Sequence, residues 1–348
     1  MKLLHVISSL EIGGAQRLLS DLLPIQKQQG LDVSLLVLRQ QDTDFTKKVL
    51  DAGVPIISLG VKNICNPALA FKLRNIIKHF DVIHVHLVHA LYLCSLAIRG
   101  LNVKLVCTEH STSNNRRGKW FMRLIEKIIY GRCQKLISIS KQTQDALQEW
   151  LQSNDERFVI INNGVDTKRF AVIRKPVIPK SLIMVSRFAS SKDQETVIRA
   201  MKHIDSEAIL RLVGDGENLN HCKQVACDCD VEDRVKFLGV RSDVAELIAE
   251  SYIGIQSSNW EGFGLTAVEI MSCGKPVIAS NVDGLKQVVE GAGEIFHKGD
   301  IIGLADCINS LLLDRHKYER VSNFCLRRAM RYDIDLMVGK YLEIYNAL

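Results

Sequence analysis

The stretch Asn259-Trp260-Glu261-Gly262-Phe263-Gly264-Leu265-Thr266-Ala267-Val268-Glu269 is the most informative part of this chain. Two glutamates, Glu261 and Glu269, stand eight residues apart on either side of a glycine-containing turn. The residues from Thr266 to Cys273 predict a helix that follows the turn directly. Glycines let backbone N–H groups approach a ligand, and a helix N-terminus attracts anions, so this turn is suited to bind phosphate.

The two carboxylates extend the expectation to hydroxyl groups on both sides of such a phosphate. A diphosphate with a polyol at each end is a nucleotide-sugar. Two glutamates at this spacing also occur by chance, as solvated side chains near a helix N-terminus. The glycines and the residues described below favour the ligand site.

Length and composition bound the class of protein. The chain has 348 residues, which is longer than a domain with a single hydrophobic core usually is, so two domains are expected. Hydrophobic residues make up 47% and charged residues 24%, as in ordinary globular proteins. Ten scattered cysteines fit reduced core thiols. The apolar start, Met1 to Ser8, predicts a first strand and not a signal peptide, and we therefore expect a cytoplasmic protein.

Short apolar runs alternate with helix-like segments along both halves of the chain. Because the runs are continuously apolar, both faces of each strand should be buried, as in a parallel sheet. Strand–helix alternation of this kind predicts doubly wound α/β sheets. The runs are 3–8, 33–38, 55–59, 82–86, 105–108 and 136–140 in the first half, then 181–186, 209–213, 235–238, 253–256 and 277–279.

The alternation stops once, which divides the chain. We expect an N-terminal Rossmann-like domain over 1–165, a linker over 166–180 that holds two of the six prolines, and a second Rossmann-like domain over 181–330. The amphipathic residues 331–348 predict a terminal helix. Ligands bind beyond the carboxyl ends of parallel strands, so two such domains would place a site in the cleft between them.

Charged and glycine residues follow several of the predicted strands. Gly13 and Gly14 come after the first strand, but no third glycine completes the dinucleotide fingerprint and no acidic residue ends the second strand. Arg187 and Lys192 follow the first strand of the second domain, where a guanidinium and an ammonium group can neutralise a diphosphate. Gly214, in Gly-Asp-Gly, lies in a further strand-end turn.

Several histidines and Phe237 are further candidate site residues at the ends of predicted strands. His110 follows the fifth strand and can donate a hydrogen bond to a sugar hydroxyl, or serve as a cap. Phe237 precedes a strand-end glycine whose backbone could face a base. His84, His86 and His89 invite a metal interpretation, but we expect strand-end packing. Asp228-Cys229-Asp230 matches the letters of a metal motif by coincidence, so we expect no metal.

The net charge of +6 is unevenly distributed, and one stretch of the chain is strongly basic. Between residues 111 and 135 there are seven basic side chains and one acid, Glu126, with Trp120 and Phe121 among them. Such a stretch fits contact with an anionic membrane or a solvated helix face equally well, and no nucleic-acid motif accompanies it. The candidate membrane contacts are Arg116, Arg117, Lys119, Arg123 and Lys127.

The order and spacing of these elements resemble the retaining glycosyltransferases of family 4, or group 1 glycosyl transferases. The resemblance covers nearly the whole chain and is carried by the Gly-Gly loop, Ser-Arg-Phe with its following lysine, Gly-Asp-Gly, Phe-Leu-Gly and Glu-x7-Glu. It implies the α/β GT-B fold, with two Rossmann-like domains facing a cleft and the C-terminal helix packed back on the N-terminal domain.

The resemblance also implies a role for each site residue. Arg187 and Lys192 resemble the pair that binds the donor diphosphate, Glu261 the glutamate near the donor sugar, and Glu269 the glutamate that holds the ribose hydroxyls. His110 resembles the histidine that contacts the donor sugar from the first domain, and Gly14 the glycine near the diphosphate. The segment whose backbone meets phosphate and sugar is Gly262, Phe263, Gly264 and Leu265.

The implied activity is retaining transfer of a hexose from a UDP- or GDP-sugar to a glycan in polysaccharide or lipopolysaccharide synthesis. The basic stretch suggests a lipid-linked acceptor at the inner face of the membrane. Departures from the family pattern are Gln16 in the first loop and Asp283-Gly284-Leu285-Lys286-Gln287, where Gly-Gly-x-Pro-Glu is frequent. An epimerase of the same fold, a nicotinamide-dependent oxidoreductase and a non-catalytic sugar-binding protein are the alternatives.

Overall fold

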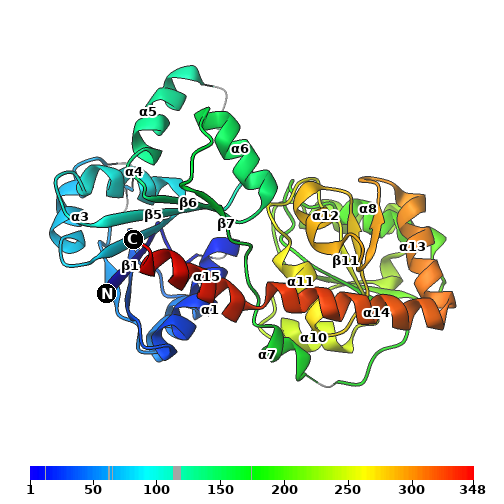
Figure 1. The fold of residues 1–348 in the computed structure, drawn as a ribbon. Coiled ribbons are helices and arrows are strands. Elements are labelled where there is room, and N and C mark those ends of the chain that lie inside the picture. Colours follow the sequence, from blue (N-terminus) through cyan, green and yellow to red (C-terminus); the bar gives the residue numbers. More distant parts are fainter. Residues whose placement is uncertain (12, 62, 65, 113–118, 174) are drawn as a thin grey trace. The chain divides into compact units, whose positions relative to one another are not determined.

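The computed structural model describes residues 1–11, 13–61, 63–64, 66–112, 119–173 and 175–348. The chain forms two compact units, the first made of Met1–Gly164 with Ile334–Leu348 and the second of Val165–Asp333. Each unit contains one parallel sheet with helices on both faces (Figure 1). The predicted α/β class with two Rossmann-like domains is therefore confirmed.

The sheet of the first unit has the order β3-β2-β1-β4-β5-β6-β7, and every pair is parallel. The strand order reverses between β1 and β4, which is the point where open α/β sheets bind their ligands. The strands are β1 (Lys2–Ile7), β2 (Asp32–Val37), β3 (Ile56–Ser58), β4 (Val82–His86), β5 (Lys104–Glu109), β6 (Lys135–Ser138) and β7 (Phe158–Ile160).

Alternate residues of these strands point into two separate cores. Leu4 and Val6 of β1 pack with the helices α3, α4, α5 and α6, whereas Leu3 and Ile7 pack with α1 and α2. Both faces of the central strands are thus buried, which explains their continuous apolar sequence. The helices are α1 (Gly14–Gln28), α2 (Asp44–Asp51), α3 (Leu69–Ile77), α4 (Val88–Ala97), α5 (Trp120–Tyr130) and α6 (Lys141–Leu151).

The second unit repeats the same plan with the strand order β10-β9-β8-β11-β12-β13. Its order reverses between β8 and β11, so the loops after these two strands lie next to each other. The strands are β8 (Ser181–Val185), β9 (Ile209–Val213), β10 (Val235–Phe237), β11 (Ile253–Gln256), β12 (Val277–Ser280) and β13 (Glu294–Phe296).

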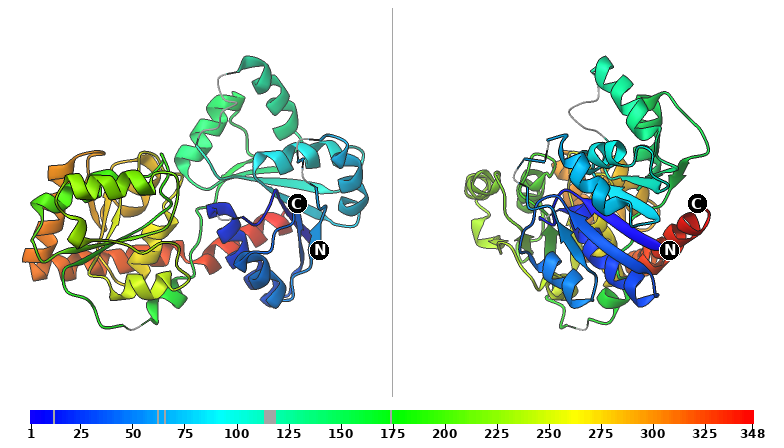
Figure 2. Two further views of the ribbon diagram at one scale, coloured as in Figure 1. Left: turned by 180° about the vertical axis from the view of Figure 1, so that it is seen from behind. Right: turned by 90° about the vertical axis from the view of Figure 1, so that its left-hand side faces the viewer.

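The helices of the second unit form two groups. One group packs α8 against α9 and α13, and the other packs α11 against α7, α10, α12 and α14 (Figure 2). The helices are α7 (Thr167–Ala171), α8 (Gln194–Ala200), α9 (Leu219–Asp228), α10 (Val244–Glu250), α11 (Leu265–Ser272), α12 (Asp283–Val289), α13 (Ile301–Leu313) and α14 (Arg315–Ala329).

The terminal helix α15 (Ile334–Asn346) returns to the first unit, as predicted. It lies beside α1, and Val338, Tyr341 and Tyr345 are buried in the core that α1 shares with β1 (Figure 1). Gly164 sits under the start of this helix, because a Cβ atom there would come within 2.6 Å of the Ile334 Cα.

Two features differ from the sequence-based expectation. The segment 166–180, expected as a linker, opens with α7, whose Phe170 is buried, and it belongs to the second unit. The strands β7 and β13 were not predicted. Both have three residues and lie at the edge of their sheet, as do β3 and β10, which the runs 55–59 and 235–238 did predict.

No helix in the described part of the chain is both long and apolar enough to cross a bilayer. The nine cysteines that the structure describes are free thiols, and six of them are buried. Burial raises the pKa of Cys133 to about 12, which makes this thiol unreactive.

Candidate functional site

The loop after β8 carries Arg187, the first of the two predicted phosphate-binding cations. The Phe188 side chain is buried and anchors the loop, whereas the Arg187 side chain is exposed and its guanidinium has no ion-pair or hydrogen-bond partner among the described residues. The Phe188 N–H donates to the Asp215 carbonyl at 2.9 Å, which ties this loop to the one after β9. Arg187 is therefore presented at the carboxyl edge of the sheet by a fixed backbone.

Lys192 and Glu261 form an ion pair across the point where the strand order reverses. Lys192 follows β8 and Glu261 follows β11, and the Lys192 Nζ also lies 3.3 Å from the Ser258 hydroxyl. The two side chains are only 18% and 22% exposed. The structure thus brings together two residues that are 69 positions apart in the sequence.

The glycine-containing turn leads into α11 as the sequence predicts. Gly264 has φ of +90°, a conformation that favours glycine, and no side chain caps the helix. An uncapped N-terminus leaves backbone N–H groups directed at whatever occupies the space in front of it. Gly262 N–H donates to the Glu261 carboxylate at 3.1 Å, so this glutamate stands directly before the helix.

The remaining residues of this turn have different surroundings. The Phe263 side chain is buried and meets the Tyr332 ring edge-on, so only its backbone is available to a ligand. Leu265 begins α11, and Glu269 lies on its buried side with 2% of its surface exposed. A carboxylate in such a position is costly to bury and is expected to serve a specific partner.

Gly214 and Gly216 let the loop after β9 lie directly on the loop that carries Arg187. A Cβ atom on Gly214 would come within 2.1 Å of the Ser186 carbonyl oxygen, and one on Gly216 within 2.3 Å of the Phe188 carbonyl oxygen. Both have positive φ, +134° and +153°. Gly214 therefore shapes the site through close backbone approach, and its N–H bonds to the Gly239 carbonyl at 2.8 Å.

Phe237, at the end of β10, packs against Phe188 with ring centroids 6.1 Å apart. Its other neighbour is the Lys223 ammonium, 6.0 Å from the ring centroid. The aromatic side chain thus joins the loops after β8 and β10 at the same edge of the sheet.

Sequence reasoning missed three residues that hold these loops. The buried Gln194 amide donates to the Ser186 hydroxyl and to the Arg187 carbonyl, both at 3.0 Å. Asp193 caps α8 and accepts from the Ser257 hydroxyl at 3.0 Å. Gly284 packs on the turn itself, since a Cβ atom there would lie 2.4 Å from the Glu261 carbonyl oxygen. The polar cluster Lys192-Asp193-Gln194 was the available signal.

In the first unit, Gly13 and Gly14 stand at the start of α1. Gly13 is the extended N-cap residue, and no side chain caps this helix. A Cβ atom on Gly14 would meet nothing within 4 Å. The helix thus has no side-chain cap at its N-terminus, and a diphosphate beside it remains a prediction.

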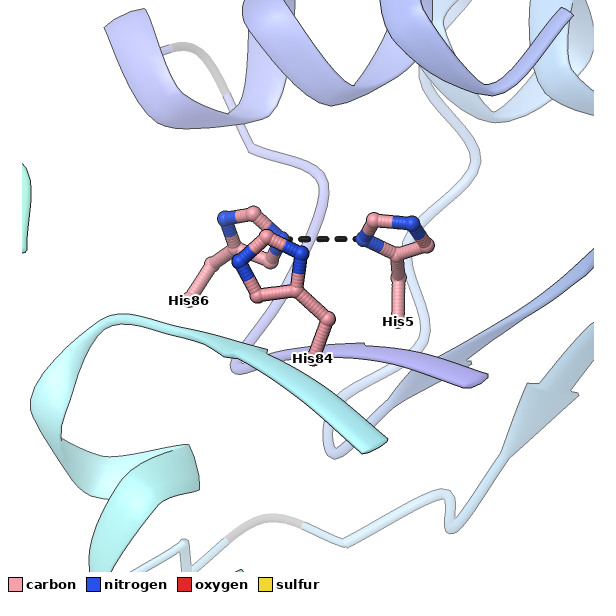
Figure 3. A group of neighbouring side chains, drawn as sticks. All are labelled: His5, His84 and His86. Atoms are coloured by element: carbon pink, nitrogen blue, oxygen red, sulfur yellow. Dashed lines mark hydrogen bonds between the residues drawn. The ribbon is translucent and has the colours of Figure 1, made fainter. Parts of the chain in front are cut away.

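His110 follows β5 and joins a group of buried histidines. Its Nε2 lies 3.1 Å from His86 Nδ1, and His86 Nε2 lies 3.0 Å from His5 Nδ1. His5 faces His84 in the register of β1 and β4, and the three rings lie close together (Figure 3). The rings contact Gln26 of α1 and Tyr345 of α15, so they lie on the face of the sheet that these two helices cover. The expected strand-end packing of His84 and His86 holds, but His5 was not predicted because it lies within an apolar run.

Burial makes these histidines weak bases. The pKa of His5 falls to about 3 and that of His110 to about 4 because a charged imidazolium would lose its hydration. The pKa values of His84 and His86 are lowered for the same reason, and further by the neighbouring histidines.

We expect the protein to lose stability as the pH falls from 7 to 5. A histidine of the unfolded chain binds a proton near pH 6.5, whereas buried His5 stays neutral down to about pH 3, so the unfolded state holds more protons in this window. His5 alone should lower the free energy of unfolding by about 2 kcal/mol over this range. Urea denaturation at both pH values measures the change. The His5→Gln variant should show a smaller drop, and an equal drop would contradict the expectation.

The basic stretch lies on and around α5. Lys119 and Lys127 are exposed and Arg123 is half-buried, whereas Arg116 and Arg117 lie outside the described residues. Glu126 is buried and accepts from the Trp150 indole at 2.6 Å, so the acid of the stretch does not face solvent.

Comparisons with known proteins agree with this geometry. Residues 12–169 match the family model described as Glycosyltransferase Family 4, and residues 165–325 match that of Glycosyl transferases group 1. The N-acetyl-alpha-D-glucosaminyl L-malate synthase of Bacillus anthracis is 30% identical over 301 residues, which cover 80% of this chain and 78% of the relative. An Escherichia coli UDP-Gal:alpha-D-GlcNAc-diphosphoundecaprenol alpha-1,3-galactosyltransferase is 24% identical over 99% of this chain and 96% of its own length.

Solved structures show the same fold. The Anabaena protein Alr3699/HepE in complex with UDP-glucose superimposes with a TM-score of 0.87 and 23% identity over 100% of both chains. The lipopolysaccharide outer core galactosyltransferase WaaB has a TM-score of 0.79 and 16% identity, again over 100% of both chains. These matches support a glycosyltransferase over an oxidoreductase and over a non-catalytic binding protein. The chain belongs to the group 1, family 4 glycosyltransferases and is a glycosyltransferase with the GT-B fold.

Proposed function

We propose that this enzyme transfers a hexose from a UDP-sugar, with retention of configuration, to a glycan or lipid-linked acceptor. The observation that carries the proposal is the arrangement at the strand-order reversal of the second unit. There Arg187 and the Lys192–Glu261 pair stand beside the uncapped start of α11. This is an arrangement of positive groups suited to a diphosphate, with a carboxylate next to it for sugar hydroxyls.

The chemistry follows from these charges. Breaking the glycosidic bond to the diphosphate places negative charge on the leaving phosphate and positive charge on the sugar ring. Arg187, Lys192 and the N–H groups at the start of α11 would stabilise the leaving group electrostatically. Glu261 is held by Lys192 and would orient the sugar, while the leaving phosphate itself accepts the proton of the acceptor hydroxyl. The two cations supply positive charge, and the proposal assigns no step to a metal.

Two observations bear on the donor nucleotide. Buried Glu269, just over one turn into α11, is the residue proposed to hold the ribose hydroxyls, which UDP and GDP share, so the base is proposed from the relatives. Among the relatives, the Anabaena protein binds UDP-glucose and the Escherichia coli enzyme carries UDP-Gal in its name. We therefore favour uridine over guanosine.

Nucleotide binding tests the donor assignment. Isothermal titration with UDP, GDP, ADP and NAD should show binding of UDP alone, unchanged by EDTA. Glu269→Gln should weaken it, because an amide offers one acceptor oxygen where a carboxylate offers two charged ones. Glu126→Gln alters a second buried glutamate, in the first unit, and should leave UDP affinity unchanged. Binding of GDP would move the donor to another nucleotide, and EDTA-sensitive binding would contradict metal independence.

The proposed lipid-linked acceptor is inferred from α5, which presents an apolar stripe to solvent. Trp120 is 70% and Ile128 64% exposed, and Phe121, Leu124 and Ile125 continue the same stripe. The helix itself, labelled in Figure 1, also carries the half-buried Arg123 and the exposed Lys127. An exposed apolar face flanked by lysines is typical of helices that lie in the interface of an anionic membrane. A lipid-linked acceptor would then be reached at the membrane surface, in polysaccharide or lipopolysaccharide synthesis.

We expect a Trp120→Glu, Ile128→Glu double variant to lose binding to vesicles that contain phosphatidylglycerol. Two carboxylates on the stripe add repulsion and remove apolar surface, so the membrane-bound fraction should fall at least tenfold, roughly 1.4 kcal/mol. Co-sedimentation measures the bound fraction. Leu313→Glu changes an 83% exposed leucine of the second unit and should leave it unchanged. Equal sedimentation of wild type and double variant would refute the membrane contact.

A further inference from the structure

Three buried histidines of the first unit, His5, His84 and His86, have ring nitrogens within 4.8 Å of one another. A metal would need one lone pair from each ring. Both His84 nitrogens already have partners, because Nε2 lies 2.7 Å from the Thr108 hydroxyl and Nδ1 bonds the Tyr345 hydroxyl. The His84 ring also lies over the His86 ring, with centroids 4.3 Å apart (Figure 3). These contacts favour a hydrogen-bonded group over a metal site.

The group forms a chain that runs from α1 to the end of β5. Gln26 Oε1 lies 2.9 Å from His5 Nε2, His5 Nδ1 lies 3.0 Å from His86 Nε2, and His86 Nδ1 lies 3.1 Å from His110 Nε2. Gln26, His5 and His86 have no exposed surface, so water does not compete for these bonds. Each link between two histidines joins one nitrogen of one ring to one nitrogen of the next.

The carbonyl oxygen of Gln26 gives this chain a direction. A carbonyl only accepts, so His5 Nε2 must carry the proton and donate. A neutral imidazole has one donor and one acceptor, hence His5 Nδ1 accepts from His86 Nε2–H. By the same step His86 Nδ1 accepts from His110 Nε2–H. Burial keeps the rings neutral by lowering their pKa values.

We propose that Gln26, His5 and His86 are positioning residues that hold His110 as its Nε2–H tautomer, with a bare Nδ1. His110 then accepts a hydrogen bond from a substrate hydroxyl at Nδ1, which is the opposite of the donor role that its sequence position indicates. The tautomer stands on the contacts alone. Its use toward a sugar hydroxyl rests on the proposed function.

Long-range ¹H–¹⁵N correlation spectra of the full chain labelled with ¹⁵N-histidine test the relay. Single His→Gln variants assign the signals. His5, His86 and His110 should each show a protonated Nε2 and a bare Nδ1 at pH 7.5. A proton on Nδ1 of His110, or a mixture of tautomers, would overturn the proposal whether or not the protein binds UDP.

Variants of Gln26 test whether its carbonyl oxygen sets the direction of the hydrogen bonds between the histidines. Gln26→Leu removes the acceptor and should convert His110 to a tautomer mixture, whereas Gln26→Glu keeps an acceptor and should retain the single tautomer. Leu19→Ala alters another buried residue of α1 and should reduce stability without moving the His110 signals. A His110 tautomer that survives in Gln26→Leu would show that Gln26 does not set it.

Kinetics with UDP-glucose separate positioning from folding. Gln26→Leu should lower kcat/KM in the wild-type background and have no further effect in a His110→Ala background, because both changes remove one function. Additive losses would contradict the relay. If no UDP-sugar is used at all, the donor assignment fails while the spectra still decide the tautomer.

Discussion

Arg187→Ala should lower kcat for sugar transfer about a hundredfold, equivalent to roughly 3 kcal/mol of transition-state stabilisation. The Arg187 side chain is exposed at the carboxyl edge and its guanidinium has no partner among the described residues, so its charge is available to the leaving diphosphate. Its loss should leave folding intact, because no internal contact of the described structure depends on its side chain. Initial rates with UDP-glucose, or with the donor that titration identifies, measure the effect.

The matched control is Arg320→Ala, an exposed arginine on α14. This change removes the same charge from the same unit away from the strand ends, and kcat should stay within twofold of wild type, roughly 0.4 kcal/mol. Similar rate losses in both variants would mean that net charge matters and Arg187 does not, which would remove the main support for the diphosphate site.

Gly214→Ala should cost roughly 3–5 kcal/mol of folding stability and abolish most UDP binding. A methyl group would meet the Ser186 carbonyl at 2.1 Å, and φ of +134° is unfavourable for any residue with a Cβ atom. The backbone at Ser186 must shift to relieve the clash, and this shift would displace the neighbouring Arg187. Urea denaturation and UDP titration measure the two losses.

Gly274→Ala separates backbone strain from the clash. Gly274 also has positive φ, +68°, but a Cβ atom there meets nothing within 4 Å. Its replacement should cost only about 1 kcal/mol and leave UDP affinity unchanged. If Gly214→Ala were no worse than Gly274→Ala, the two strand-end loops would not need their close approach.

Much of the fold could be predicted because its signals are local. The runs 82–86, 209–213 and 253–256 coincide with β4, β9 and β11, since a strand buried on both faces must be continuously apolar. The amphipathic end of the chain likewise predicted α15. The short edge strands β7 and β13 were missed, whereas the equally short edge strands β3 and β10 were predicted, so strand length alone does not explain the difference.

The candidate site in the second unit was predicted in its residues but not in its contacts. Glycines and charges after apolar runs indicated Arg187, Lys192 and Glu261, because strand ends are where parallel sheets bind ligands. That Lys192 pairs with Glu261 follows from the strand order, which places β8 beside β11. The polar cluster after β8 marks the position of Gln194, but its bonds to the loop, like the packing of Gly284, depend on loop geometry and could not be predicted.

The fold class and the residue types at the strand ends could be predicted from the sequence alone because their signals are local, and the family from the order of short motifs along the chain. The structure was needed to show that His5, His86 and His110 form one chain that ends on Gln26. These residues come from β1, β4, the end of β5 and α1, and the hydrogen-bond direction requires them to meet around the fully buried His5, His86 and Gln26. Side-chain partners of this kind are set by packing, which no local pattern encodes.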